Sequence, residues 1–310
     1  MYKTIRVTPV LVILGPTASG KTKLAAAIAK HISGEIISAD SRQVYRELNI
    51  GTGKDYSDYV VEGKLIPYHL IDCVNPDELF TVSDFIREYD QARTRIEKQC
   101  KRTILCGGTG SYIVAALNGL TYDGIPPNTH LRNQFTHLTK EELYTYFTAM
   151  PRTAVHETAD CTTAKRVLRA IEIADYLNTN KSFKPAEARQ TPSHIIGLSL
   201  NTDVRNARIE KRLTSRLQHG LLDEGERICT RYGYTVMHRM GLEYKFMALH
   251  LSGTLTYAEF YEQLLTAIKQ FAKRQMTYFR KMQRDGMDIH WIDAELTLQD
   301  QCKAIMNYIT

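Results

Sequence analysis

A phosphate-binding loop between an apolar strand and a helix is the feature that most constrains the fold of this chain. The run Val10–Leu14 is entirely apolar, as expected for a buried strand of a parallel sheet. It leads directly into Gly15–Thr22, which fits the pattern Gly, four residues, Gly-Lys-Ser/Thr. Lys23–Lys30 then predicts a helix. This strand–loop–helix order is the context that the motif requires, so we expect the loop to bind a di- or triphosphate.

The chemistry of this loop follows from its backbone and from two side chains. Backbone N–H groups and the positive end of the following helix surround the phosphates in such loops. Lys21 is expected to reach the phosphates, and the Thr22 hydroxyl to hold Mg²⁺. The motif alone does not specify the phosphate compound or the reaction. The expected phosphate-binding residues are Gly15, Pro16, Thr17, Ala18, Ser19, Gly20, Lys21 and Thr22.

Strand and helix patterns alternate through the first third of the chain. Further strands are expected at 34–38, 66–72 and 103–106, and helices at 82–98 and from Tyr112 onward. Such alternation predicts a P-loop NTPase-like α/β core, a parallel sheet with helices on both faces. Ligands bind such sheets at the carboxyl ends of the strands. Asp40 and the glycine loop Gly107–Gly110 both follow strand ends, so we expect them near the phosphate loop.

The pattern changes after Thr121, where Gly124–Asn128 is a cluster of helix and strand breakers. Helices are expected at 141–150 and 163–177, the second capped by Asp160 or Thr162, and no strand is expected before a returning strand at 195–200. We therefore divide the chain into residues 1–121, the first part of the core, residues 122–191, an all-helical insertion, and residues 192–310, which complete the core.

The remainder is expected to be helical, with helices at 203–220, 221–231 and 257–284. In the last of these, one face is apolar and a neighbouring stripe is basic. The apolar face holds Leu265, Ile268, Phe271, Ala272, Met276 and Phe279, and the stripe holds Lys269, Lys273, Arg280 and Arg284. Such a stripe fits either a solvated helix face or a surface that follows a nucleic-acid backbone.

Composition narrows the class of protein. The 310 residues carry a net charge of +6, which permits a polyanionic partner. The six cysteines are scattered without a Cys-x-x-Cys pair, so neither zinc nor disulfides are expected. No apolar run approaches the ~18 residues of a membrane helix, and no signal peptide is visible. We therefore expect a cytoplasmic protein without membrane contact, monomeric by default.

Asp40 is the candidate catalytic group. A carboxylate across the crevice from the phosphate loop can accept a proton from a nucleophile that attacks a group attached to the bound phosphates. A simpler alternative is that Asp40 only caps the next helix. Thr109, in the second glycine loop, could hydrogen-bond a substrate or orient Asp40.

Six segments occur in the order seen in one enzyme family. They are Gly15–Thr22, Ser38–Tyr45, Ile50–Lys54, His69–Asp72, Gly107–Tyr112 and Ala272–Arg280. With them the chain resembles the tRNA dimethylallyltransferases, also called tRNA isopentenyltransferases, over nearly its whole length. The resemblance implies that the loop binds dimethylallyl diphosphate. It also implies transfer of the five-carbon group to the exocyclic N6 of the adenosine just 3′ of the anticodon.

The resemblance further implies a role for individual residues. Asp40 would be the general base and Thr109 would help to position the adenine. Arg208 and Arg212 would lie near the diphosphate channel, and the helical insertion would bind tRNA. The implied contacts with the tRNA anticodon stem-loop are Asp40, Ser41, Arg42, Gln43, Thr109, Lys165, Arg166, Arg169, Arg239, Lys273, Arg274, Gln275 and Arg280.

Several positions depart from the family's pattern. Gly53 and Asp55 stand where Ala and Pro are frequent, and Tyr278 stands where Trp is usual. Glu47 and Gly241 lie in two further segments that differ. None of these departures affects Lys21, Thr22, Asp40 or Thr109.

Two other functions share part of this pattern. A small-molecule or nucleotide kinase has the same loop and core and carries arginines in a lid, and the insertion holds Arg152, Arg166 and Arg169. A non-catalytic tRNA-binding protein could use a nucleotide as a switch. The segment Ser38–Gln43 and the basic C-terminal helix favour the transferase over both.

Overall fold

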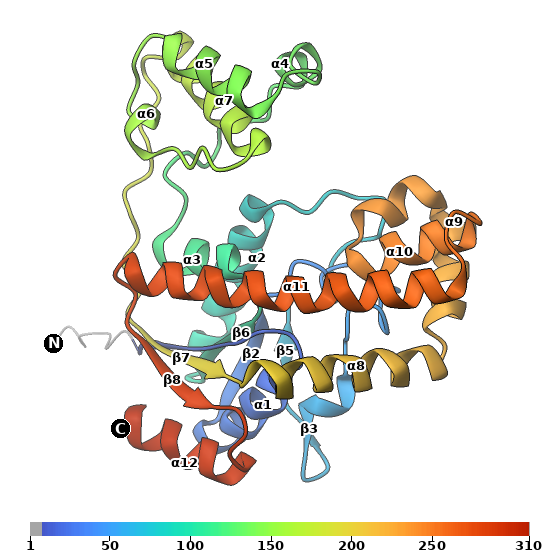
Figure 1. The fold of residues 1–310 in the computed structure, drawn as a ribbon. Coiled ribbons are helices and arrows are strands. Elements are labelled where there is room, and N and C mark those ends of the chain that lie inside the picture. Colours follow the sequence, from blue (N-terminus) through green and yellow to red (C-terminus); the bar gives the residue numbers. More distant parts are fainter. Residues whose placement is uncertain (1–7, 310) are drawn as a thin grey trace, which may run out of the picture. The chain divides into compact units, whose positions relative to one another are not determined.

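The computed structural model describes residues 8–309, which form two compact units (Figure 1). The first, here the α/β unit, comprises the chain up to Asn118 and from Arg189 onward. The second, here the helical unit, is Gly119–Ala188. Each unit has its own apolar core, and each is described by itself below.

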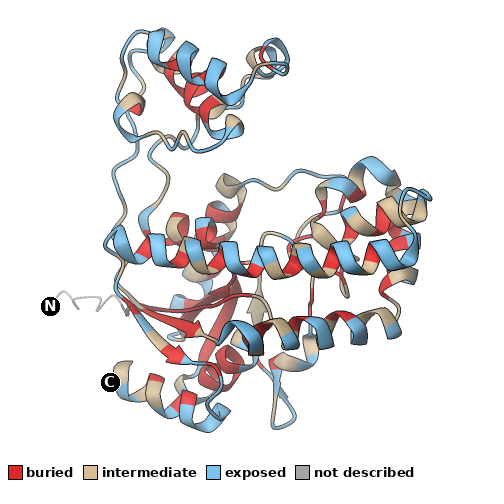
Figure 2. Cartoon of the chain, viewed as in Figure 1, coloured by how far each residue is buried: buried red, intermediate tan, exposed pale blue. Residues whose placement is uncertain are grey.

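A six-stranded parallel sheet forms the centre of the α/β unit, in the order β5-β2-β6-β1-β7-β8. This confirms the predicted α/β class. The strands are β1 (Val10–Leu14), β2 (Gly34–Ser38), β5 (Tyr68–His69), β6 (Arg102–Gly107), β7 (Ser193–Ser199) and β8 (Ile289–Asp293). Every residue of β1 and β2 is buried, as Figure 2 shows, because helices cover both faces of the sheet.

The two faces of the sheet are covered by different helices (Figure 1). Helices α1 (Lys21–Ile32) and α12 (Leu298–Ile309) share one apolar cluster with β1, β2 and β6. Helices α2 (Val82–Lys98) and α3 (Gly110–Asn118) lie on the opposite face. Thr81 caps α2 through a capping box with Asp84, which satisfies backbone donors at its first turn.

Two predicted features of the sheet are wrong. The strand expected at 66–72 is reduced to Tyr68–His69, because Leu70 and Asp72 adopt positive φ angles of 62° and 57° that end the extended backbone. The chain after Arg284, expected to be helical, instead supplies β8, which pairs in parallel with β7. A two-residue hairpin, β3 (Val60–Val61) and β4 (Lys64–Leu65), also escaped prediction.

Four helices build a second apolar cluster beside the sheet. They are α8 (Thr202–Gln218), α9 (Leu221–Arg239), α10 (Leu242–Leu251) and α11 (Tyr257–Arg284). The predicted bounds of α11 are confirmed, but Phe271 of its predicted apolar face is 41% exposed. Helix α9 continues beyond the expected Arg231 across a break at Gly233, where φ is 79°.

The helical unit contains α4 (Thr129–Gln134), α5 (Lys140–Ala149), α6 (Val155–Thr158) and α7 (Ala164–Thr179). Its core includes Phe135, Phe147 and Ile171. The cap of α7 is Thr163, whose hydroxyl accepts from the Arg166 N–H, rather than Asp160 or Thr162. Asp160 and Thr162 instead accept hydrogen bonds from the Arg166 guanidinium at 2.7 Å each.

Candidate active site at the carboxyl edge of the sheet

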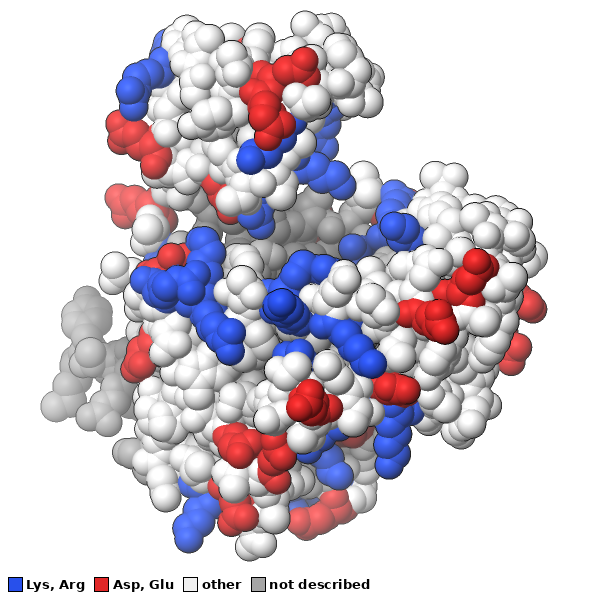
Figure 3. Space-filling model, in the orientation of Figure 1, with Lys and Arg blue, Asp and Glu red and all other residues white. Residues whose placement is uncertain are grey.

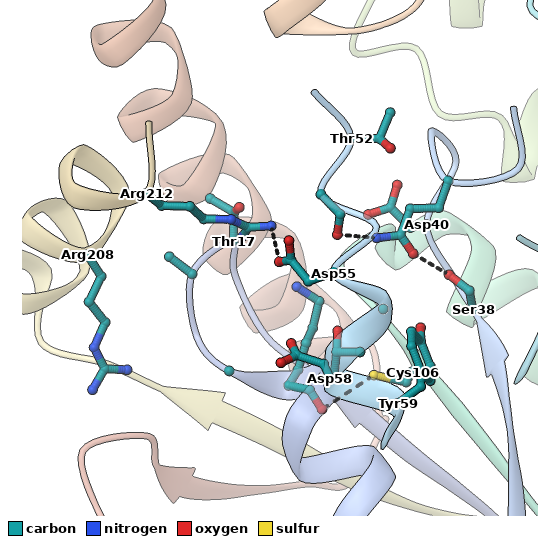
Figure 4. Close-up of a pocket in the computed structure, with 17 residues that line it drawn as sticks. Thr17, Ser38, Asp40, Thr52, Asp55, Asp58, Tyr59, Cys106, Arg208 and Arg212 are labelled. Atoms are coloured by element: carbon teal, nitrogen blue, oxygen red, sulfur yellow. Dashed lines mark hydrogen bonds and ion pairs between the residues drawn. The ribbon is translucent and has the colours of Figure 1, made fainter. Parts of the chain in front are cut away.

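One pocket of about 280 Å³ lies where the phosphate loop, the end of β2 and α8 meet (Figure 4). It brings together the loop, Asp40 and both predicted arginines of α8. Its lining is strongly charged, with cations and carboxylates both represented. The lining residues are Thr17, Ala18, Gly20, Lys21, Thr22, Ser38, Asp40, Gln43, Thr52, Gly53, Asp55, Asp58, Tyr59, Cys106, Gly107, Arg208 and Arg212.

The phosphate loop presents the N-terminus of α1 to this pocket. Gly20 is the N-cap residue, in a left-handed conformation, and no side chain caps this helix. Its first N–H groups are therefore available to an anion. Burial lowers the pKa of Lys21 from its ordinary value, and the Asp40 carboxylate partly offsets that effect. Lys21 thus lies in the anion-binding loop, where burial opposes its charged form and the Asp40 carboxylate favours it.

Asp40 is held in a tight turn at the end of β2. Its Oδ1 accepts a hydrogen bond from the Arg42 N–H at 2.9 Å, and the Ser41 N–H donates to Thr109 Oγ1 at 3.1 Å. Ser38 and Gln43 close the turn through a 3.0 Å bond between Oγ and Oε1. Thr109 therefore holds the turn that carries Asp40 through its bond with Ser41.

Gln275 of α11 joins the two glycine loops instead of facing outward. Its Oε1 accepts from the Thr17 N–H at 2.9 Å, and its Nε2 donates to the Gly108 carbonyl at 3.0 Å. A Cβ on residue 108 would lie 2.3 Å from that Nε2, so the close approach requires glycine. Gln275, expected among the tRNA contacts, is buried and links the two glycine loops.

The arginines of α8 differ in their surroundings. Arg212 points toward Asp55, and its Nη2 lies 3.1 Å from Asp55 Oδ2 (Figure 4). Arg208 donates to the Ala294 carbonyl at the end of β8, at 3.3 and 3.4 Å. Both line the pocket, and each also has a protein partner.

Sequence reasoning missed several pocket residues. Cys106 lies at the end of β6, where burial raises the pKa of its thiol to about 12, so it stays a neutral thiol near neutral pH. Asp58 and Tyr59 come from a 3₁₀ turn, Tyr56–Tyr59. Burial raises the pKa of Asp58, and the neighbouring Asp55 raises it further. No motif marks this turn, because its place depends on the loop that precedes it.

A buried carboxylate supports that preceding loop, which forms one wall of the pocket. Glu224 of α9 is 1% exposed and accepts hydrogen bonds from the N–H groups of Asn49, Ile50 and Gly51 at 2.9–3.0 Å. The Tyr244 hydroxyl donates a fourth bond at 2.6 Å. Four donors around one buried carboxylate hold Thr52 and Gly53 in place at the pocket.

We predict that Glu224→Gln destabilises the protein by about 2–4 kcal/mol. The glutamine NH₂ group cannot accept hydrogen bonds, so at least one of the backbone N–H groups that now donate to Glu224 would lose its acceptor. Equilibrium unfolding in urea measures the change. Glu226→Gln, on the exposed side of the same helix, is the control and should alter stability by less than about 0.5 kcal/mol. Equal stabilities for the two variants would show that Glu224 does not stabilise the loop at Asn49–Gly51.

Exposed cations gather on the outer face of α11, as Figure 3 shows. Of the predicted tRNA contacts, Lys273, Arg274 and Arg280 are exposed there, and Arg274 lies 6.0 Å from the Phe271 ring centre. The same helix therefore presents a basic outer face and, through Gln275, an inner face that touches the phosphate loop.

Other predicted tRNA contacts already bond within the protein. Arg42 donates to the Arg239 carbonyl at 2.9 Å, and Arg239 donates to the carbonyls of Pro76 and Asp77. These two arginines tie the Asp40 turn to α9. In the helical unit, Arg169 donates to Glu172 and to the Ile125 carbonyl, at 3.0 and 2.6 Å, whereas Lys165 is exposed.

No group of three or more His, Cys, Asp or Glu side chains in residues 8–309 is placed to hold a metal ion. No helix within the described range has the length and apolar character needed to span a membrane.

Comparison with known proteins identifies the family. The IPP transferase family model matches residues 43–282, and the isopentenyl transferase model matches residues 8–66. The chain is 43% identical to tRNA dimethylallyltransferase 1 of Parabacteroides distasonis over 96% of its length and 97% of the relative's. It is also 43% identical to tRNA dimethylallyltransferase 1 of Porphyromonas gingivalis, covering 97% of this chain and 99% of that protein.

A solved structure agrees with these sequence matches. The tRNA isopentenylpyrophosphate transferase of Bacillus halodurans superposes with a TM-score of 0.71 at 29% identity, over 97% of this chain and 95% of that one. The match includes both the α/β core and the length of chain that holds the helical unit. The chain therefore belongs to the tRNA dimethylallyltransferase family and is a prenyltransferase.

Proposed function

We propose that this protein transfers a dimethylallyl group from dimethylallyl diphosphate to the exocyclic N6 of the adenosine 3′-adjacent to the anticodon of tRNA. The observation that carries the proposal is that Asp40, Lys21, Thr22 and Arg212 all line the same pocket. It combines an anion-binding loop for a diphosphate leaving group with a carboxylate that can take a proton from the attacking amine.

The reaction requires both halves of this pocket. The lone pair of N6 is delocalised into the adenine ring, so the amine is a poor nucleophile. As the N6–C1 bond forms and the C1–O bond to diphosphate breaks, Asp40 accepts the N6 proton. Loop N–H groups, Lys21 and Arg212 stabilise the charge that develops on the departing diphosphate.

We propose Mg²⁺ as the cofactor, and the side chains present fit it. Mg²⁺ prefers oxygen ligands and commonly takes one or two from the protein, the rest from substrate phosphates and water. Thr22 lines the pocket that the diphosphate would enter, so its hydroxyl would supply one ligand and the diphosphate oxygens and water the others. Bound there, the ion would neutralise charge on the diphosphate.

For the RNA, we propose that the anticodon stem-loop contacts the exposed cations of α11 and Lys165 of the helical unit. The target adenine must leave its stack to enter a pocket, at a cost of roughly a few kcal/mol. Contacts with the phosphate backbone would offset that cost. A monomeric protein acting in the cytoplasm fits this function.

The salt dependence of binding tests the α11 contact. We predict that Lys273→Ala with Arg280→Ala weakens binding of an anticodon stem-loop and lowers the salt slope by about 1–2, because two phosphate contacts are lost. Filter binding across a range of salt concentrations measures both. Lys211→Ala, an exposed lysine of α8, is the control for charge alone. An unchanged salt slope in the double variant would show that these residues form a solvated helix face and do not contact the RNA.

Substitution in the RNA tests the acceptor atom. A stem-loop with adenosine 3′ of the anticodon should be prenylated, and one with inosine there, which has oxygen in place of N6, should not. Both RNAs should bind with similar affinity, so a difference in product would reflect chemistry. Equal modification of both RNAs would contradict the proposal.

A further inference from the structure

We propose that Asp55 is an internal competitor for the donor: it holds Arg212 when the pocket is free and yields it to the diphosphate when the donor binds. The proposal rests on the proposed function, since it assumes that a diphosphate occupies this pocket. It assigns to Asp55 a positioning role that sets how tightly the diphosphate is held and how fast it leaves.

The geometry places a carboxylate where a ligand anion would lie. Arg212 Nη2 is 3.1 Å from Asp55 Oδ2, and both residues line the pocket with Lys21 and Thr22. Arg212 and Asp55 also act in opposite directions on the pKa of Lys21, which Arg212 lowers and Asp55 raises. All three groups therefore share one electrostatic environment, in which the Asp55 carboxylate is the anion paired with Arg212.

Packing behind Arg212 keeps its guanidinium close to the pocket. A Cβ on residue 53 would lie 2.1 Å from Arg212 Nη2 and 2.0 Å from Arg216 Nη2, and the φ of 69° at this position favours glycine. The two cationic groups approach each other closely at this point. Gly53 and Arg216 therefore both lie close to the Arg212 guanidinium.

Arg216 adds an electrostatic reason. Burial, together with the adjacent positive charge of Arg212, lowers the pKa of Arg216 to about 10, while Glu243 acts in the opposite direction. Its Nη2 is buried with no hydrogen-bond partner among the described residues. A cation in this position repels Arg212, whose ion-pair partner among the described residues is Asp55. In the complex, the diphosphate would take that place.

The ion pair is suited to exchange. The side chains of Arg212 and Asp55 are 31% and 53% exposed, and exposed ion pairs are weak. A diphosphate carries several negative charges and also bonds the loop, so it displaces Asp55. After transfer, Asp55 competes again for Arg212 and so promotes release of the product diphosphate.

Calorimetric titration with inorganic diphosphate and Mg²⁺ tests the proposal. Asp55→Asn should bind diphosphate about fivefold more tightly than the wild type. Asp58→Asn is the matched control, because Asp58 lines the same pocket without an ion pair to Arg212, and it should change affinity less than twofold. In an Arg212→Met background, Asp55→Asn should also have less than a twofold effect.

The outcomes separate this proposal from the proposed function. If Asp55→Asn binds diphosphate no more tightly than the wild type, or if Asp58→Asn tightens binding equally, the competitor role is overturned. If Asp55→Asn binds more weakly, Asp55 supports the complex instead of competing with it. If the wild type itself does not bind diphosphate, the proposed function fails first.

Discussion

Asp40→Asn should slow prenyl transfer by about 10²–10⁴-fold while leaving tRNA and donor affinities within about twofold of the wild type. The asparagine Oδ1 can still accept the 2.9 Å bond from the Arg42 N–H, so the turn is preserved and only the base is lost. Single-turnover transfer with saturating donor and RNA measures the chemical step.

Asp40→Ala provides the comparison. It removes both the base and the turn acceptor, so its loss of rate should equal or exceed that of Asp40→Asn. A rate for Asp40→Asn within a few-fold of the wild type would mean that another group accepts the N6 proton.

Lys21→Met should reduce kcat/KM for dimethylallyl diphosphate by about 10²–10³-fold. Methionine keeps much of the side-chain length but removes the cation that stabilises the departing diphosphate. The stability of the variant should change little or rise, because burial opposes the charged form of Lys21 in the free protein. Initial rates as a function of donor concentration, with RNA saturating, measure the effect.

Lys30→Met is the control for this substitution. Lys30 lies in the last turn of the same helix and pairs with Glu62, away from the pocket. It should leave kcat/KM within about twofold. A similar loss in both variants would indicate a general effect on α1 and not a role for Lys21 in catalysis.

Local patterns in the sequence predict the centre of this protein well. The phosphate loop, the strand at Val10–Leu14 and the helix at Val82–Lys98 follow from runs of neighbouring residues, and the structure confirms their class and position. Ligands bind parallel sheets at the carboxyl ends of the strands, and this rule alone predicts that Asp40 and Lys21 lie near each other. In the structure both residues line one pocket.

What escaped prediction depends on contacts between distant segments. The resemblance places Gln275 among the tRNA contacts, yet its side chain bonds Thr17, 258 residues away in the chain. Glu224 carries no sequence signal for its role, because its four donors come from the loop at Asn49–Gly51 and from Tyr244. The strand β8 is short and follows a long helix, and only its pairing with β7 defines it.

The relation between Gly53 and Asp55 is of the same kind. In the sequence, Gly53 and Asp55 are two departures from the family's pattern, and nothing in that pattern connects them. In the structure, Gly53 leaves space for two guanidinium groups and Asp55 binds one of them. A sequence pattern can flag such positions, but their coupling through Arg212 depends on the packing of α8 against the loop.

Analysis of the tRNA product tests the central claim most directly. Purified protein would be incubated with unmodified tRNA that has adenosine 3′ of the anticodon, Mg²⁺, and either dimethylallyl diphosphate or ATP, and the digested tRNA examined by mass spectrometry. We expect one dimethylallyl group on that adenosine, with the diphosphate donor only. Unmodified tRNA with the diphosphate donor, together with consumption of ATP when nucleosides are added, would contradict the account and favour a kinase.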